Sequence, residues 1–312
     1  MSIIVFGSLN MDLVAQVPRL PQAGETLLGK DFATVPGGKG ANQAVAAARL
    51  AVSTTMVGRV GDDSFGAALC DSLRTAGVAT DLVSTVQGPS GVALITVDEE
   101  GENQIVVVPG ANGQVNETDV DRLPLPDAAT DEPLILLMQF EIPLAAVMSA
   151  AKRAKEHCVI VDPAPARSDL PPDFYRWVDI LTPNQTEASQ LTGVNVSGVT
   201  TAMEAAQTLR QRGASTVIVK LGSQGAVLAS KSEVLHVPAF EVEPVDTVAA
   251  GDAFNGGLAV ALSEGKSLGQ AVKWANAVAA LAVMKAGAQP SMPTREAVET
   301  FLLSHPSGRL LS

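Results

Sequence analysis

The chain has 312 residues, enough for one large α/β domain or two average domains, and we expect a single domain, residues 1–312, with a small appendage. Hydrophobic residues make up 46% of the sequence and aromatic residues only 4%, which favours packed helices and parallel strands over a surface that stacks bases. The net charge of −12 argues against a nucleic-acid partner, because proteins that bind a phosphate backbone usually carry a basic patch.

The cysteines, histidines and hydropathy exclude further classes. Cys70 and Cys158 are too few and too far apart to suggest a disulfide framework, so we expect a reducing cytoplasm. No basic segment precedes an apolar run at Met1, and no apolar run reaches ~18 residues, so we expect neither export nor membrane insertion. The three histidines lack ligand spacing, which argues against a zinc site.

The first segment predicts a buried strand whose end faces a site. Residues 2–6 form a short apolar run that ends at Gly7. Polar and apolar residues then alternate, which places Asn10 and Asp12 on one face of an extended segment, either in a site or on a solvated strand face. Residues 15–36 carry prolines, glycines and short β-prone pieces where a doubly wound fold would have a helix, so they predict a β excursion.

A glycine-rich turn follows at residues 37–44, Gly-Gly-Lys-Gly-Ala-Asn-Gln-Ala, and leads into an Ala-rich helix that ends near Leu50. Adjacent glycines let the backbone approach a ligand closely, and Asn42 would face back toward the turn. This is not a P-loop, because the Gly-x-x-x-x-Gly-Lys-Ser/Thr spacing is absent. The residues alone also fit an ordinary turn with a solvated Lys39.

The next region breaks the strand–helix alternation again. Residues 54–76 predict a strand and then an amphipathic helix capped by Asp62 or Asp63. Residues 91–108 contain two β-prone runs around a polar turn, the pattern of a hairpin. We group this hairpin with the preceding β excursion, so that segments 12–36 and 91–108 form a small sheet outside the main one.

From residue 133 the alternation is regular, and polar residues follow the strands. Glu141 follows the first strand, Asp162 the second and Asn184 the third. Asn184-Gln-Thr-Glu187 has the pattern of a helix capping box, which is compatible with a second role in a site. A helix is expected over 144–155, and strands are expected over 134–138, 159–162, 177–181, 216–221 and 234–242.

The run from Asp246 to Gly257 places two carboxylates around small residues that open a helix. Its glycines cost helix stability and suggest close packing against a neighbour. The amides of Ala249, Ala250 and Gly251 can hold an anion, because the first N–H groups of a helix lack partners and face its positive dipole end. Asp252 could then take a proton from an attacking hydroxyl, although an Asp at a helix start is also simply favourable.

Two motifs resemble signatures of the ribokinase family of sugar kinases. They are Asp-Thr-Val-Ala-Ala-Gly-Asp-Ala-Phe-Asn-Gly from Asp246 and the glycine-rich turn at 37–44, and they lie in the family's order about 210 residues apart. The resemblance covers nearly the whole chain. It implies that Asp252 is the catalytic base, with Ala249, Ala250 and Gly251 at an anion hole. The sugar contacts that it implies are Asn10, Asp12, Gly38, Lys39, Asn42, Glu141 and Asp252.

The same resemblance implies a nucleotide site with magnesium and a separate site for a monovalent cation such as K⁺. On the ATP side it implies Asn184, Glu187, Lys220, Gly222, Ser223, Gly225, Gly251 and Asn276, with Asn184 and Glu187 ordering water bound to Mg²⁺. Around the monovalent cation it implies Asp246, Val248, Ala282, Lys285, Gly287 and Ser291. Asp162 stands where a more neutral residue is expected, and we expect it to take no part in the chemistry.

The resemblance therefore implies a three-layer α/β/α Rossmann-like sandwich with a small β-sheet lid. The implied reaction is ATP-dependent phosphorylation of D-ribose at its 5-hydroxyl, in a homodimer formed through the lids. A kinase for 2-deoxyribose, a ketohexose or a nucleoside would use the same scaffold. A sugar-binding regulator without catalysis is the other alternative, although such a protein would be expected to have lost the base.

Overall fold

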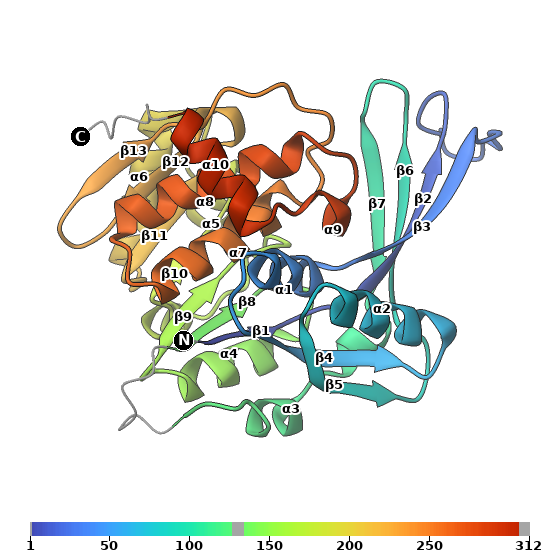
Figure 1. Ribbon diagram of the computed structural model, residues 1–312, viewed down its shortest axis with the longest axis horizontal. Helices are drawn as coiled ribbons and strands as arrows, with labels where there is room; N and C mark the ends of the chain where they lie inside the picture. The colour runs from blue at the N-terminus through green and yellow to red at the C-terminus, as the bar shows by residue number, and fades with distance from the viewer. Residues whose placement is uncertain (1, 127–133, 306–312) are drawn as a thin grey trace.

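The computed structural model describes residues 2–126 and 134–305 and is built around one large sheet (Figure 1). Its strand order is β13-β12-β11-β10-β9-β8-β1-β4-β5. The strands of this sheet are β1 (Ser2–Phe6), β4 (Thr54–Gly61), β5 (Ala79–Val86), β8 (Leu134–Met138), β9 (Cys158–Val161), β10 (Ile180–Leu181), β11 (Thr216–Lys220), β12 (Ala226–Ala229) and β13 (Val234–Val237).

The winding of the sheet reverses between β1 and β8. Neighbouring strands from β5 to β11 pair in parallel, and β12 and β13 add an antiparallel edge. From β1 the chain moves outward to β4 and β5, and it later returns to β8 on the other side of β1. In open α/β sheets, ligands bind outside the carboxyl ends of the strands at such a reversal.

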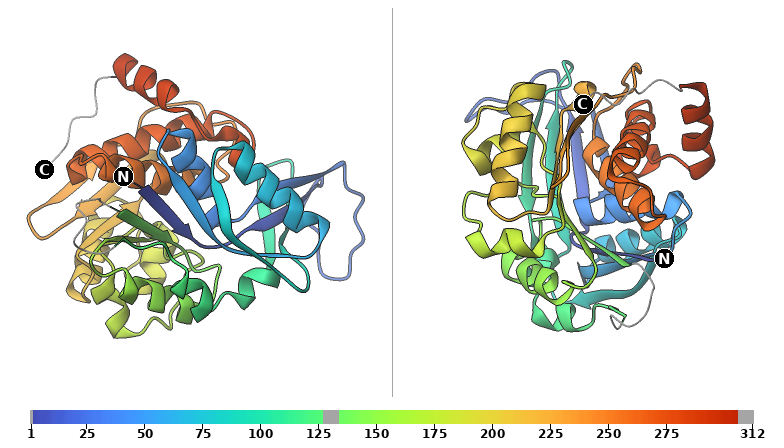
Figure 2. Two further views of the ribbon diagram at one scale, coloured as in Figure 1. Left: turned by 60° about the horizontal axis from the view of Figure 1, so that its bottom comes forward. Right: turned by 90° about the vertical axis from the view of Figure 1, so that its left-hand side faces the viewer.

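Helices cover both faces of the sheet, as Figure 2 shows in its right-hand view. Alternate residues of β1 face opposite sides: Ile3 and Val5 join one apolar core, while Ile4 and Phe6 join the other. On the first side lie α1 (Lys39–Arg49), α2 (Ser64–Thr75), α7 (Ala250–Ser263), α8 (Leu268–Val283) and α10 (Arg295–Ser304). On the second lie α3 (Glu117–Asp121), α4 (Leu144–Arg153), α5 (Gln185–Thr192) and α6 (Val199–Gln211).

The three layers confirm the predicted α/β sandwich. Within the described ranges, no helix is both long enough and apolar enough to cross a bilayer.

A second, four-stranded sheet stands beside the main body in Figure 1, with the order β3-β2-β6-β7. It consists of β2 (Asn10–Gln16), β3 (Asp31–Gly37), β6 (Gly91–Val97) and β7 (Asn103–Val108). β6 and β7 lie within residues 91–108, whereas β2 and β3 extend beyond residues 12–36, to Asn10 at one end and to Gly37 at the other. We call this element the small sheet; its β7 edge is exposed along its whole length.

Two expected strands are shorter than the sequence suggests. Of residues 177–181, only Ile180–Leu181 forms a strand, because the prolines before it begin a 3-10 turn over Pro172–Trp177. The run at 234–242 ends at Val237, since Pro238 has no N–H to continue the ladder. The predicted alternation also omits β5, β12, α6 and α10.

Glycines let α7 pack closely against two other helices. A Cβ atom on Gly256 would lie 2.5 Å from Cβ of Ala46 in α1. One on Gly257 would lie 2.8 Å from Cγ2 of Val278 in α8. This is the close packing that the sequence predicts for helical glycines.

We expect Gly256→Ala to lower the free energy of unfolding by about 1–3 kcal/mol, because the added methyl group must push α1 away from α7. Urea denaturation followed by circular dichroism measures this change. Gly113→Ala is the control: Gly113 is exposed, its added Cβ would meet only Cβ of Pro109 at 3.4 Å, and a change below about 0.5 kcal/mol is expected. Equal effects of the two substitutions would contradict a tight α1–α7 contact.

Candidate active site

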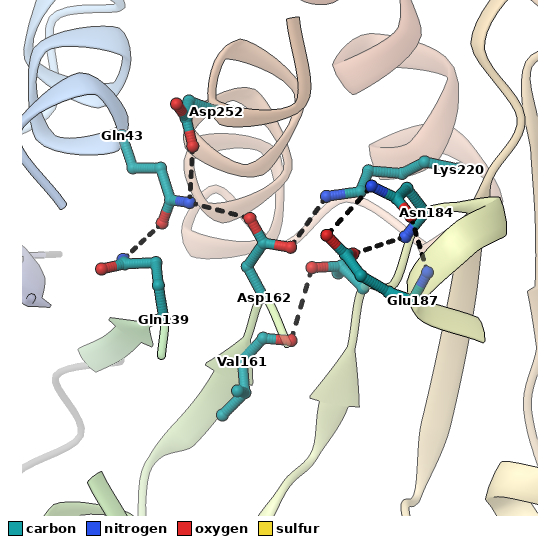
Figure 3. Close-up of polar contacts among 9 residues, drawn as sticks. Gln43, Gln139, Val161, Asp162, Asn184, Glu187, Lys220 and Asp252 are labelled. Carbon is teal, nitrogen blue, oxygen red and sulfur yellow. Dashed lines mark hydrogen bonds and ion pairs between the residues drawn. The ribbon is translucent and has the colours of Figure 1, made fainter. Parts of the chain in front are cut away.

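Polar side chains gather where the parallel strands end, on both sides of the reversal between β1 and β8. These residues are Ser8 after β1, Gln139 and Glu141 after β8, Asp162 after β9, Asn184 after β10 and Lys220 at the end of β11. Figure 3 shows how several of them point toward one another and toward Asp252 on α7. The strand ends and the first turns of α1 and α7 therefore form the candidate site.

Glu141 organises one half of the site. Its Oε2 accepts hydrogen bonds from Oγ of Ser8 at 2.5 Å, Nδ2 of Asn10 at 3.3 Å and the backbone N–H of Lys39 at 3.1 Å. Gly38 precedes Lys39 with φ +90°, and a Cβ there would lie 2.6 Å from the backbone nitrogen of Asn10. The glycine therefore allows the turn before α1 to approach the start of β2.

Asn112 fixes Asn10 from the other side and was not anticipated from the sequence. Its Nδ2 donates to Oδ1 of Asn10 at 2.7 Å and to the backbone oxygen of Leu9 at 3.0 Å, while its Oδ1 accepts from the N–H of Leu9 at 2.9 Å. Asn112 lies in a 3-10 turn, where no periodic pattern marks it.

Asp12 lies two residues further along β2 and is partly buried. Burial, reinforced by the negative charges of Glu141 and Asp252, raises the pKa of Asp12 from its usual 3.8 to about 7. A Cβ on Gly37, in the neighbouring strand β3, would lie 2.2 Å from Oδ2 of Asp12. The carboxyl group therefore fits only against a glycine.

Asp252 is 5% exposed and is held by two amides from α1. Its Oδ2 accepts from Nδ2 of Asn42 at 3.1 Å, and its Oδ1 accepts from Nε2 of Gln43 at 3.0 Å. Burial raises the pKa of Asp252, while Lys39 and the two amides oppose that rise and Asp162 adds to it.

Lys39 supplies positive charge next to Asp252. Burial alone would lower the pKa of Lys39, but nearby carboxylates outweigh burial and raise it above its usual range. These carboxylates belong to Asp252, Asp162, Glu141 and Glu187. Lys39 therefore stays protonated at neutral pH.

The start of α7 presents backbone N–H groups to the same part of the site. Ala249 caps the helix in the left-handed conformation with φ 59°, which is strained for a residue with a Cβ. The amides of Ala250, Gly251 and Asp252 have no partners within the helix, although that of Ala250 makes a 3.3 Å bond to the carbonyl of Thr247. A Cβ on Gly251 would lie 3.4 Å from Nζ of Lys220, so this turn faces an ammonium group.

A cavity of about 450 Å³ extends from Lys39 and Asp252 across the ends of β9, β10 and β11. Its walls include most of the expected nucleotide residues, namely Asn184, Glu187, Lys220, Gly222, Gly225, Gly251 and Asn276. Ser223 lies on the exposed side of its turn and does not line the cavity. Nδ2 of Asn276 donates to the backbone oxygens of Val237 and Pro238, both at 3.1 Å, so the residue also has a structural role.

Asp162, which is expected from the sequence to take no part in the chemistry, nevertheless lies within the site. Asp162 lines the cavity and is 1% exposed, and its Oδ1 accepts from Nζ of Lys220 at 2.9 Å. Its Oδ2 accepts from Nε2 of Gln43 at 3.2 Å, the same nitrogen that binds Asp252. A buried charge needs such partners. The position of Asp162 directly after β9 could have indicated that it lies in the site, although not which residues it contacts.

Asn184 and Glu187 form the predicted capping box of α5. The N–H of Glu187 donates to Oδ1 of Asn184 at 2.8 Å, and the N–H of Asn184 donates to Oε2 of Glu187 at 2.7 Å. Burial raises the pKa of Glu187, and Asp162 adds to the effect. Within the described ranges, no cluster of three or more histidine, cysteine or acidic side chains could hold a metal ion by itself.

Asp246 joins two loops near the end of α8. Its Oδ1 accepts from the N–H of Val248 at 2.9 Å, and its Oδ2 accepts from the N–H of Gly287 at 2.8 Å. Its own N–H donates to the carbonyl of Val283 at 3.1 Å, beside the turn in which the N–H of Lys285 donates to the carbonyl of Ala282. Ser291, in α9 (Ala288–Ser291), donates to the carbonyl of Ala288.

Known proteins match the chain over nearly its whole length. The family model for "pfkB family carbohydrate kinase" matches residues 1–295. A ribokinase from Haemophilus influenzae is 41% identical over 304 residues, 96% of this chain and 98% of its own. A deoxyribokinase from Salmonella typhi is 37% identical over 307 residues, 97% of this chain and 99% of its own. The structure of Arabidopsis thaliana ribokinase complexed with ribose and ATP matches with a TM-score of 0.86 and 35% identity, over 96% of this chain and 98% of that one.

Proposed function

The chain belongs to the pfkB family of carbohydrate kinases, and we propose that it transfers the terminal phosphoryl group of ATP to the 5-hydroxyl of D-ribose. The observation that carries this proposal is the place of Asp252. Its carboxylate lies where the Glu141–Asn10–Asp12 cluster meets the 450 Å³ cavity, directly at the start of α7. The sugar binds at the Glu141–Asn10–Asp12 cluster, and ATP binds in the cavity.

The residues around this junction divide the work of phosphoryl transfer. Asp252 accepts the proton of the attacking hydroxyl, late in a loose transition state, because a carboxylate is a weak base toward an alcohol. The amides at the start of α7, together with Lys220 and Lys39, face the negative charge that develops on the phosphoryl group. An intact Asp252 also argues against a binding regulator without catalysis.

We expect Asp252→Asn to bind ribose and ATP almost normally and to lose about 10²-fold or more in kcat, the usual size of a general-base effect. A coupled assay of ADP release measures kcat, and isothermal titration calorimetry measures binding. Asp71→Asn, on the exposed face of α2, is the control and should retain wild-type turnover. Turnover of Asp252→Asn within a few-fold of wild type would remove Asp252 from the mechanism.

Magnesium enters this proposal with the nucleotide. Mg²⁺ is usually held by one or two carboxylates, water and substrate phosphates, so the lack of a three-ligand cluster in the described part of the chain fits an ion that arrives with ATP. Glu187 and Asn184 line the cavity and would order the water molecules bound to Mg²⁺. The ion would neutralise phosphate charge there.

A monovalent cation beside Asp246 is a further part of the proposal. One carboxylate and the carbonyl groups that the family resemblance implies, those of Val248, Ala282, Lys285, Gly287 and Ser291, are oxygen donors of the kind that hard cations prefer. Hydrogen bonds tie Val248 and Gly287 directly to Asp246. A cation there would strengthen the positive electrostatic field at the start of α7, whose first turn contains Asp252, four residues after Val248.

We expect kcat to rise when K⁺ replaces a bulky organic cation such as tetramethylammonium at constant ionic strength. Asp246→Asn should weaken this response, because the substitution removes the negative charge from the group of donors. The measurement is ADP release as a function of K⁺ concentration. An identical rate in both salts would rule out the cation site.

Asp12 is the residue that supports ribose over 2-deoxyribose, a choice that matters because a deoxyribokinase is among the relatives at 37% identity. When ionised, Asp12 only accepts hydrogen bonds, and we place the 2- and 3-hydroxyls of ribose against it. A hydrogen bond to a charged group contributes about 1.5–3 kcal/mol, which corresponds to roughly a ten- to hundred-fold preference for ribose in kcat/KM.

We expect Asp12→Ala to reduce kcat/KM for ribose far more than for 2-deoxyribose, because only ribose presents the 2-hydroxyl that loses its partner. Asp31→Ala, an exposed position at the start of β3, is the matched control. The measured quantity is the ratio of kcat/KM for the two sugars. A wild-type ratio in Asp12→Ala would show that Asp12 does not bind the 2-hydroxyl and would remove the main physical support for ribose over 2-deoxyribose.

We also propose that two copies pair through the small sheet, which acts as a lid over the sugar, and that the protein works in the cytoplasm. Large apolar side chains on the small sheet are 43–62% exposed, namely Phe32, Leu94, Ile105, Val106, Val107 and Val108. An exposed apolar edge strand such as β7 needs cover, and a second copy supplies it symmetrically. The two unpaired cysteines suit a reducing compartment.

Sedimentation velocity at micromolar concentration should therefore give a dimer. Val106→Lys should shift the protein toward monomer, because it places a charge on the exposed strand β7. Leu303→Lys, which changes an 84% exposed side chain on α10, should leave the dimer intact. A fully active wild-type monomer would refute pairing through the small sheet.

A further inference from the structure

A chain of hydrogen bonds through Gln43 connects the two halves of the site (Figure 3). Gln43 lies in the first turns of α1 and is fully buried. Its Nε2 donates to Oδ1 of Asp252 at 3.0 Å and to Oδ2 of Asp162 at 3.2 Å, and Oδ1 of Asp162 accepts from Nζ of Lys220 at 2.9 Å. The amide nitrogen of Gln43 therefore connects the carboxylate of Asp252, through Asp162, to the ammonium group of Lys220 in the cavity.

Gln139 determines which way the amide of Gln43 points. Nε2 of Gln139 donates to Oε1 of Gln43 at 2.6 Å, and Gln139 is itself fully buried directly after β8. A Cβ on Gly7 would lie 2.0 Å from Oε1 of Gln139, so the end of β1 confines this side chain. If the amide of Gln43 were reversed, its oxygen would face two carboxylates and its NH₂ group would face another NH₂ group. The observed orientation therefore satisfies both ends of the Gln43 amide, whereas Oε1 of Gln139 is buried without a partner in the described part of the chain.

We propose that Gln43 is a positioning residue for phosphoryl transfer: held by Gln139, it orients the carboxylate of Asp252 and couples this carboxylate to the Asp162–Lys220 ion pair. The inference rests on the proposed role of Asp252 as the base. Asn42 holds Oδ2 of Asp252 and Gln43 holds Oδ1, so both oxygens are fixed from α1. Losing one of the two contacts frees the carboxylate to rotate away from the attacking hydroxyl, and small misplacements of this kind cost large factors in rate.

The first test separates rate from binding. Gln43→Met keeps the length of the side chain and removes its amide, and it should lower kcat about 10- to 100-fold while KM for ribose and ATP changes less than about threefold. Gln139→Met should act in the same direction but less strongly, because Gln43 remains and only loses its fixed orientation. Gln211→Met makes the same chemical change at an exposed position of α6 and should leave kcat unchanged.

The second test reads the carboxylate of Asp252 itself, in the ligand-free protein. The ¹³C resonance of its carboxyl group, identified by its absence in Asp252→Asn, is followed from pH 4 to 9. Gln43→Met should raise the titration midpoint by about one pH unit, since an N–H donor that favours the ionised form is lost. Asp162→Asn should lower the midpoint, since it removes a neighbouring negative charge. Lys39 on α1 and Asp12 on β2, the other charged groups that act on Asp252, remain in both variants.

Opposite shifts in these two variants are the signature of the proposed coupling, because a merely structural role for Gln43 would not produce them. Wild-type kcat in Gln43→Met, or an unmoved midpoint in both variants, would overturn the inference. Failure of the proposed function would look different: the wild-type protein would not phosphorylate ribose, while the NMR titration would still show whether Gln43 controls Asp252. If Gln43→Met did not fold, Gln139→Met and Asp162→Asn would decide the same question.

Discussion

The burial of one carboxylate, that of Asp252, determines how the rest of the site must be built. An ionised carboxylate in a protein interior is costly unless charges and hydrogen bonds replace its water. Here the replacements come from α1, which supplies Lys39, Asn42 and Gln43, and from the start of α7. The two helices must therefore meet with little tolerance, and the glycine in their contact, Gly256, allows them to do so.

Other acidic groups share this confined region, and their different partners give them different properties. Asp162 is balanced by Lys220, and Glu141 accepts three hydrogen bonds, whereas Asp12 has neither kind of partner among residues 2–126 and 134–305. Asp12 is accordingly the carboxyl group whose pKa burial and neighbouring charge raise to about 7. A bound sugar whose hydroxyl groups donate hydrogen bonds would supply Asp12 with the partners that the surrounding protein does not provide.

Much of this arrangement could be predicted from the sequence, because local rules govern it. The capping box at Asn184, the helix after Asp246 and the polar strand ends follow from short patterns, and the structure has all three. Asn112, Gln139 and Asp162 could not be assigned partners in this way, since their contacts join segments 58 to 119 residues apart. Gln43 lies inside a recognisable motif, yet its role depends on two carboxylates and an amide from three distant segments. The lengths of β10 and β13 were not predicted correctly, because nearby prolines shorten both strands.

The position of Asp12 on β2 has a consequence for how such an enzyme changes over time. Most of the groups to which we assign the chemistry belong to α1 and α7, which pack in the main core. Asp12, which we assign to reading the sugar, belongs instead to the small sheet, which contributes little to that core. Substitutions in β2 and β3 can therefore alter the choice of sugar while the contact between α1 and α7 stays intact. A fold with this division can acquire a new sugar specificity through changes in the small sheet.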